Sequence, residues 1–374
     1  MTGMEVKQQE YVYAHHLWIY RLLYYKKPDA PRNCFSAIFT SLQSSLFFPL
    51  VSKLRSSFFR LSCSYLVEMA GQGKCSIIPD TVPSDAGIAG AGVLLASTIT
   101  AGLALCISAS LVLQSLTWHA SRFKTQRDQN QSVIRRKLLN GYSDQQIMVG
   151  IGLQSIGLVK SDSLVPYHFF LIWMLALLSM ATHNAALLAL VQDFKRDWVL
   201  RWMRQVLMFA NLALSCVYGV YVLQSKVKGL PDTLPIGCVW KVESTSSNVG
   251  GLDYVGTIVT IVGNCVVFGL ATWYLQSRRQ RFYQAVQVVG LILMLGIAIG
   301  ATVRAYLLSQ AFGNPDVKLE DEGEKQWSFG QLLSLLMLLL PLISAIEIMR
   351  GEIAVAPPVH DEDKQALFSE KPSV

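Results

Sequence analysis

Residues 167–191 read YHFFLIWMLALLSMATHNAALLALV and contain no lysine, arginine, aspartate or glutamate. A helix needs about 20 predominantly apolar residues to cross the hydrocarbon core of a bilayer, and this stretch is long enough. Three basic residues, Lys195, Arg196 and Arg201, follow it closely. Basic residues beside a span favour the cytosolic side of the membrane. The stretch therefore predicts a transmembrane helix whose C-terminal end lies in the cytosol.

Six further apolar segments lie on either side of this one. The seven segments are roughly 87–115, 145–160, 167–191, 198–223, 253–276, 282–309 and 328–349. The chain is 52% hydrophobic and 15% charged, whereas about 25% of the residues in soluble domains are charged. We therefore predict an all-α fold, a polytopic transmembrane helical bundle of seven spans over residues 87–349.

The second segment, 145–160, is the weakest of the seven. It is short and rich in glycine, so a re-entrant segment is the alternative to a span. A true span is favoured because an even number of crossings would break the charge alternation downstream. Ser143 and Gln146 have the spacing of a capping box, which predicts a helix start at this point.

Basic residues cluster on every second connection between the predicted spans. They follow the first, third and fifth spans: Arg122, Lys124, Arg127, Arg135, Arg136, Lys137, Lys195, Arg196, Arg201, Arg278, Arg279 and Arg281. The positive-inside rule places these connections in the cytosol, so the bundle begins outside and ends inside. Residues 350–374 then form a disordered cytosolic tail. We expect a multi-pass protein of the endomembrane system, at the endoplasmic reticulum.

Residues 1–86 form an N-terminal extension of a different, partly polar character. Its moderately apolar segment 33–50 has four interpretations: an eighth span, an amphipathic interfacial helix, a targeting segment, or sequence outside the native product. In the last case the native chain would begin at Met69. All four interpretations leave the seven predicted spans unchanged.

The cysteines and the glycine patterns predict neither a metal site nor a cofactor. None of the seven cysteines forms a CxxC pair, and the chain has no HExxH, GxSxG or Walker motif. Cys75 and Cys238 fall on the predicted non-cytosolic side, where disulfides persist, so we predict that they pair. The net charge of +7 lies largely in short loops beside apolar spans. It orients the protein against anionic lipid, so the predicted partner is the lipid bilayer and not nucleic acid.

Polar side chains within the predicted membrane are the candidate functional residues, because such groups are expensive there. For the residues near the predicted outer face, the functional interpretation is a pocket. In this pocket Asp85 or Asp253 would pair with Arg304 beneath an aromatic wall that includes Tyr218 and Tyr221. The alternative is that the two acids favour helix starts, the tyrosines form an interfacial belt and Arg304 extends to the surface.

A second group of polar residues lies near the predicted inner face. Its functional interpretation is a proton-handling site, and its members are Asp144, His183, Asn184, Arg201, Arg204 and Glu347. The alternative is interhelical hydrogen bonding, which polar residues supply in membrane bundles. The same structural role is predicted for Asn211 and Asn264, while Asp144 has the further interpretation of a first-turn acid.

Three motifs carry a resemblance to a known group: residues 85–93 (DAGIAGAGV), 143–146 (SDQQ) and the basic, tryptophan-flanked stretch 197–204. They resemble a group of fungal integral membrane proteins that is similar to the membrane-bound terpene cyclases of meroterpenoid pathways, of the ascofuranone and ascochlorin type. The resemblance covers about 69–350. Ala86 and Ala91 depart from it, standing where larger apolar residues are expected. We interpret the glycines of 87–92 as sites of close helix packing.

The resemblance implies an intramembrane terpene cyclase of secondary metabolism. Such an enzyme protonates an epoxidised, prenylated small molecule and lets the chain fold onto the resulting cation. This chemistry needs a buried acid, and the candidates are Asp144, Asp253 and Glu347. The alternative is a seven-span receptor or sensor without enzymatic activity, and the third choice is a small-molecule transporter.

Overall fold

The computed structural model describes residues 75, 78–118, 126–196, 198–242, 251–276, 282–315 and 317–350. The chain divides into two units, Met1–Leu66 and Val67–Val374, and every described residue belongs to the second. The predictions for segment 33–50, for a start at Met69 and for the tail after residue 350 therefore lie outside the described residues.

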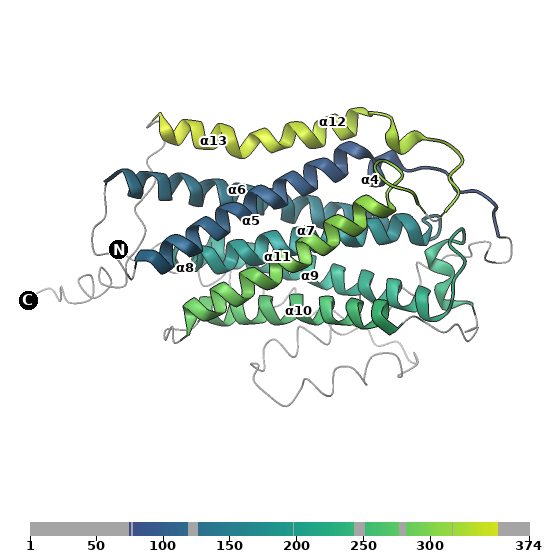
Figure 1. Cartoon of the computed structure of the whole chain (residues 1–374), viewed down its shortest axis with the longest axis horizontal. Coiled ribbons are helices and arrows are strands. Elements are labelled where there is room, and N and C mark those ends of the chain that lie inside the picture. Colours follow the sequence, from purple (N-terminus) through teal and green to yellow (C-terminus); the bar gives the residue numbers. More distant parts are fainter. Residues whose placement is uncertain are drawn as a thin grey trace, which may run out of the picture. The chain divides into compact units, whose positions relative to one another are not determined.

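The described part is helical apart from its loops and one isolated bridge between Val82 and Leu319, so the predicted all-α class is confirmed there. The long helices lie side by side (Figure 1). In chain order the elements are α4 (Ala86–Ala89), α5 (Ala91–Trp118), α6 (Gln126–Val159), α7 (Pro166–Ala189), α8 (Val191–Arg196), α9 (Trp198–Val227), η1 (Ile236–Trp240), α10 (Gly251–Gln276), α11 (Tyr283–Leu308), η2 (Gly323–Lys325), α12 (Phe329–Leu336), η3 (Met337–Leu339) and α13 (Leu340–Met349).

Helix α7 forms the centre of the bundle. It contacts α5, α6, α9, α10 and α11, and 21 of its 24 residues are buried. A helix that is apolar on all sides is stable only when it is surrounded. Aromatic contacts fix its first half to α9, where Tyr218 stacks on Phe169 with ring centroids 4.0 Å apart. The buried position of Tyr218 and Tyr221 excludes the interfacial belt predicted for them.

Six helices are long and apolar enough to cross a membrane: Ala86–Leu116, Pro166–Ala189, Arg201–Val227, Tyr254–Gln276, Tyr283–Leu308 and Gly323–Met349. The predicted span 145–160 is absent from this set, although it lies within α6, which packs against α5, α7, α9 and α13. The helix begins at Gln126, so Ser143 and Asp144 lie in its interior. The predicted capping box and the interpretation of Asp144 as a first-turn acid are therefore wrong.

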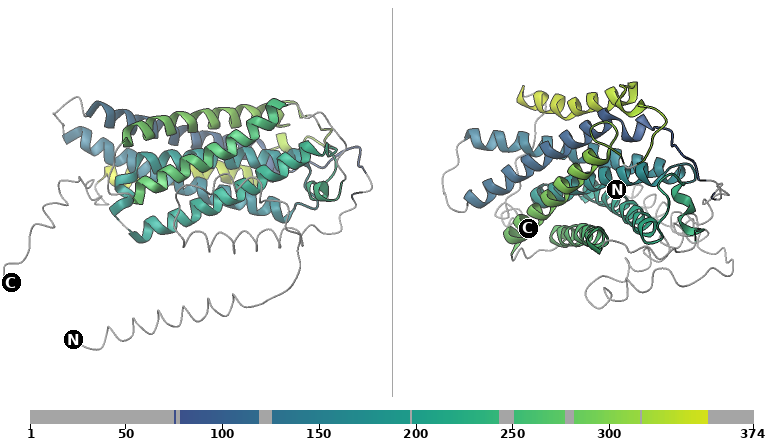
Figure 2. Two further views of the ribbon diagram at one scale, coloured as in Figure 1. Left: turned by 90° about the horizontal axis from the view of Figure 1, so that it is seen from below. Right: turned by 45° about the vertical axis from the view of Figure 1, so that its right-hand side comes forward.

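One end of the bundle is closed by covalent and hydrogen-bonded connections, and we call it the disulfide end. Cys75 and Cys238 are joined there with a Cα–Cα distance of 5.7 Å, which confirms their predicted pairing. In the same region the Val82 amide donates to the Lys318 carbonyl at 3.1 Å. Helices α5, α7 and α10 begin at the disulfide end, whereas α6, α9 and α11 return to it (Figures 1 and 2).

The last apolar segment is not one straight helix. A 3-10 turn, η3, separates α12 from α13, and Pro341 lies in the first turn of α13. Figure 2 shows both helices on one side of the bundle, where α12 contacts α5 and α13 contacts α6. Gly92 receives the Gln331 side chain, which accepts a hydrogen bond from the Gly92 amide at 3.1 Å. This contact confirms the packing role predicted for the glycines.

Candidate functional site

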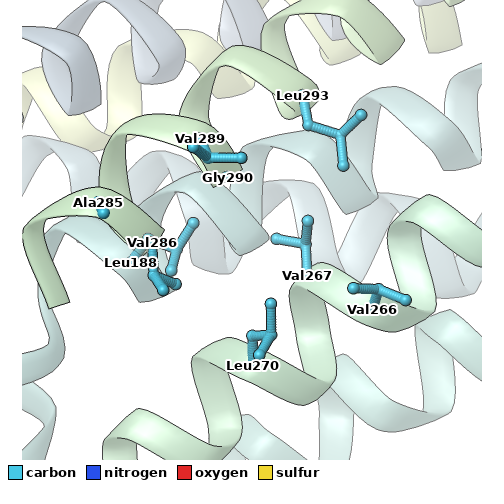
Figure 3. A pocket seen from close by; sticks show the side chains of 9 residues that line it. All are labelled: Leu188, Val266, Val267, Leu270, Ala285, Val286, Val289, Gly290 and Leu293. Carbon is cyan, nitrogen blue, oxygen red and sulfur yellow. The ribbon is translucent and has the colours of Figure 1, made fainter. Parts of the chain in front are cut away.

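An apolar groove lies between α10 and α11 and is floored by the end of α7 (Figure 3). Its volume is about 250 Å³. The nine lining side chains carry no polar group: Leu188, Val266, Val267, Leu270, Ala285, Val286, Val289, Gly290 and Leu293. Gly290 permits close packing of α11 on α7 at the floor of the groove, because a Cβ atom there would lie 2.5 Å from Leu188 Cδ1. A groove of this composition suits an aliphatic chain and offers no group for acid–base chemistry.

A layer of buried polar side chains lies one helical turn from the groove, toward the disulfide end. Asn184 precedes Leu188 by one turn on α7, and Asn264 precedes Val267 by one turn on α10. The Asn184 amide donates to Met294 Sδ of α11 at 3.6 Å. The Oδ1 atoms of both asparagines are buried and make no hydrogen bond. An unpartnered buried acceptor is unfavourable, so these two oxygens are candidate acceptors, although neither asparagine lines the groove itself.

A chain of hydrogen bonds connects α6, α7 and α9 on another side of α7. Gln154 donates to Asn211 Oδ1 at 2.5 Å, Asn211 donates to Ser179 Oγ at 3.1 Å, and Ser179 donates to the Gln146 carbonyl at 2.6 Å. Interhelical hydrogen bonding, as predicted for Asn211, is confirmed. The same prediction for Asn264 is wrong, because its amide donates to the Thr260 carbonyl of its own helix.

His183 continues this polar face of α7 one turn beyond Ser179. Its side chain is fully buried, and neither ring nitrogen makes a hydrogen bond of good geometry. Because α6 and α7 are antiparallel and Ser179 meets Gln146, His183 lies level with Ser143. The Ser143 hydroxyl is also buried and without a partner. Two polar groups of the candidate site therefore occupy one level of the α6–α7 interface.

The three candidate acids lie in three different places. Asp144 Oδ2 accepts from Arg204 Nη2 at 2.6 Å, which joins α6 to α9. Glu347 lies on α13, is partly exposed and pairs with no described residue. Asp253 lies in the first turn of α10, and its side chain is outside the described set. Neither Asp144 nor Glu347 lines the groove.

The predicted outer pocket is described only on its Asp85 side. Asp85 caps α4 by accepting from the Gly87 amide at 3.1 Å and pairs with Lys160, not with Arg304, at 3.0 Å. Its role as a helix-start acid is confirmed, while the alternative pair of Asp253 with Arg304 involves a side chain outside the described set. Arg304 lies on an exposed face of α11.

The disulfide end contains a buried acid that the sequence did not reveal. Glu324 Oε1 lies 2.8 Å from His168 Nε2, and Glu324 Oε2 accepts from the Tyr167 hydroxyl at 2.8 Å. The Glu324 side chain is completely buried. In the sequence it is one of four loop acids near Lys325, and no motif distinguishes it. Nearby, hydrogen bonds from Ser84 and the Gly323 amide hold the pKa of Asp321 below its ordinary value.

Within the described ranges, no group of three or more histidine, cysteine or acidic side chains is placed to hold a metal ion. No family model, curated protein or solved structure matches the chain.

Proposed function

We propose that this chain is a seven-crossing membrane protein that binds an apolar small molecule of the prenyl type. The molecule enters sideways from the bilayer into the groove between α10 and α11. The observation that carries this proposal is the wholly aliphatic lining of the groove, one turn from two buried amide oxygens that lack partners. Ligand sites typically combine mainly apolar walls with a few polar groups that fix orientation.

The proposed seventh crossing is α6. Helices α5 and α7 both begin at the disulfide end, so the chain between them has to return the full length of the bundle. The 34 residues of α6 extend over about 50 Å, more than the hydrocarbon thickness of about 30 Å. Its first part is rich in arginine and glutamine, which explains why its composition differs from that of the other spans.

The proposed orientation places the disulfide end on the non-cytosolic side of an endomembrane and the C-terminus in the cytosol. Two features support it. The Cys75–Cys238 disulfide is typical of an oxidising compartment. The basic residues Arg135, Arg136 and Arg204 lie toward the opposite end, as the positive-inside rule requires of a cytosolic end.

Binding without turnover, as in a receptor or sensor, is the activity that the geometry favours. A cyclase needs an acid that reaches the bound substrate. Asp253 precedes Val266 by thirteen residues on one helix, a distance of about 20 Å. Asp144 and Glu347 belong to α6 and α13, neither of which contributes to the groove.

A terpene cyclase is the second candidate. The observation that favours it is the same aliphatic groove, which excludes water and suits a prenyl chain. The resemblance of residues 85–93 and 143–146 to fungal membrane proteins adds to it. In this case the acid would act on a part of the substrate that extends beyond the groove.

Photoaffinity labelling in lipid nanodiscs tests the binding proposal. The probe is a farnesol analogue with a diazirine and an alkyne, and unlabelled farnesol is the competitor. We expect competable labelling of peptides from α10 and α11. Ala285→Phe fills the exposed mouth of the groove and should reduce labelling at least several-fold, whereas Gly296→Phe changes an open position on the same helix and should leave it unchanged.

Uniform labelling of all lipid-facing helices, without competition by farnesol, would refute the groove as a binding site. Incubation of the protein with an epoxidised prenylphenol, followed by mass spectrometry, separates the two candidates. Recovery of unchanged substrate supports a sensor. A cyclised product that is absent from nanodiscs without protein supports the cyclase.

A further inference from the structure

Two free thiols meet between α9 and α10, in the membrane-spanning part of both helices. Cys216 Sγ lies 3.8 Å from Cys265 Sγ, within hydrogen-bond distance for sulfur. Both cysteines are free and separate from the Cys75–Cys238 disulfide. Two thiols in direct contact across two helices form a redox-active arrangement that a single buried cysteine does not provide.

The packing of α9 against α10 brings these two sulfur atoms together. The helices are antiparallel, and one turn from the thiols Gly219 of α9 faces Ile261 of α10. Any side chain at Gly219 would overlap Ile261 Cδ1, so the glycine permits a close approach of the two helices. A disulfide requires the sulfur atoms to move nearer by roughly 1.8 Å.

We propose that Cys216 and Cys265 form a reversible dithiol–disulfide site that lipid hydroperoxides oxidise within the bilayer. Cys265 lies on an exposed face of α10, a candidate span. An oxidant dissolved in the lipid can therefore reach it without entering the bundle. Cys106 of α5 is also exposed and makes no contact with another described cysteine, so it provides an internal comparison.

The reaction is balanced with the hydroperoxide as the two-electron oxidant. One thiol attacks the terminal oxygen and breaks the O–O bond while its proton passes to the leaving alkoxide, giving a sulfenic acid and the lipid alcohol. The second thiol then attacks the sulfenic sulfur, forms the S–S bond and releases water. The sulfur–sulfur hydrogen bond stabilises negative charge on the attacking atom. A dithiol reductant returns both sulfur atoms to thiols.

Oxidation would join α9 covalently to α10 beside the apolar groove. Val266 and Val267, which line the groove, directly follow Cys265. The α10 wall of the groove would then be tethered to α9. The thiol site does not depend on ligand binding, because its geometry is complete without a ligand.

Oxidation in nanodiscs that contain linoleoyl hydroperoxide tests the proposal. The readout is mass spectrometry of peptides after the remaining thiols are alkylated. We expect a Cys216–Cys265 linked peptide that dithiothreitol cleaves. The Cys216 and Cys265 thiols should disappear about 10-fold faster than that of Cys106, because the hydrogen bond between the two sulfur atoms assists the attack on the hydroperoxide. Cys216→Ser and Cys265→Ser should each abolish the link and leave a sulfenic acid that dimedone traps.

Three results would overturn the proposal. The first is that both thiols remain alkylatable in the presence of hydroperoxide, and the second is that they react no faster than Cys106. The third is a link that forms with copper–phenanthroline but not with the hydroperoxide, which would show two adjacent thiols without the proposed reactivity.

Discussion

His168 Nε2 lies 2.8 Å from Glu324 Oε1, and the two side chains are 3% and 0% exposed. The pair joins the first turn of α7 to η2, in the loop that precedes α12. The Tyr167 hydroxyl donates to the second carboxylate oxygen and accepts from the Gln310 amide at 2.9 Å. Because the His168, Tyr167 and Glu324 side chains are all buried, the loop is fixed to the central helix of the bundle.

Removal of the Glu324 carboxylate should destabilise the bundle strongly. Glu324→Ala leaves His168 and Tyr167 buried without their acceptor, and breaking a buried pair in this way costs about 3–5 kcal/mol. The measurement is unfolding in detergent micelles, followed by heat or denaturant. Glu322→Ala is the control, because its pair with Lys325 is exposed and should contribute less than about 1 kcal/mol. Equal effects of the two substitutions would contradict the structural role of Glu324.

The glycines of the first span should differ in their tolerance of alanine. A Cβ atom at Gly92 would lie 2.6 Å from Gln331 Cβ, so Gly92→Ala has to displace α12 and should cost about 1–3 kcal/mol. At Gly102, on the same helix, a Cβ atom meets nothing within 4 Å. Gly102→Ala should be neutral or stabilise by up to about 1 kcal/mol.

The same unfolding assay compares the two glycine variants. In the Gly92→Ala variant, one cysteine introduced into α5 and one into α12 would report through disulfide formation whether α12 and α13 stay attached to the bundle. Similar stability of both variants would show that α12 does not depend on its contact with Gly92.

The proposed crossing of α6 predicts opposite labelling of its two ends. Lys137 and Ser163 are both exposed and are separated by about 40 Å along the helix direction. In sealed vesicles an impermeant maleimide should react with Lys137→Cys from one side only and with Ser163→Cys from the other side only. Wild-type protein corrects for the native cysteines. Labelling of both positions from the same side would establish a re-entrant α6 and six crossings.

Two kinds of feature were predictable from the sequence: the helices that face lipid, and the side of the membrane on which each loop lies. Apolar length gave the six spans, and the alternation of charge placed Cys75 and Cys238 on one side, which made their disulfide predictable. The boundaries of α6 were not predictable, because its first half is polar and is held in a helix by packing. Likewise, tertiary contacts selected Glu324 from several equivalent loop acids.

The groove was invisible in the sequence for a related reason. Its lining residues are ordinary aliphatic side chains, and the groove forms only where α7, α10 and α11 come together. Polar residues such as His183 and Asn184 were recognised individually, because any polar group within an apolar span is conspicuous. Their division between two faces of α7 depends on the helices that pack around it.

The Asp144–Arg204 pair allows a structural role of Asp144 to be separated from a catalytic one. The Asp144 side chain is 44% exposed, so Asp144→Asn should reduce stability by only about 1 kcal/mol. The exchanged variant, Asp144→Arg with Arg204→Asp, should recover part of that loss, because the opposite charges again meet in a double-mutant cycle. Farnesol labelling of the groove should be unchanged in both variants, since neither α6 nor α9 lines it. Suppose that the wild type forms a cyclised product, that Asp144→Asn loses it, and that the exchanged variant regains stability but not product. Asp144 is then the acid that the resemblance implies. If the product persists in Asp144→Asn, the Asp144 carboxylate serves only to join α6 to α9.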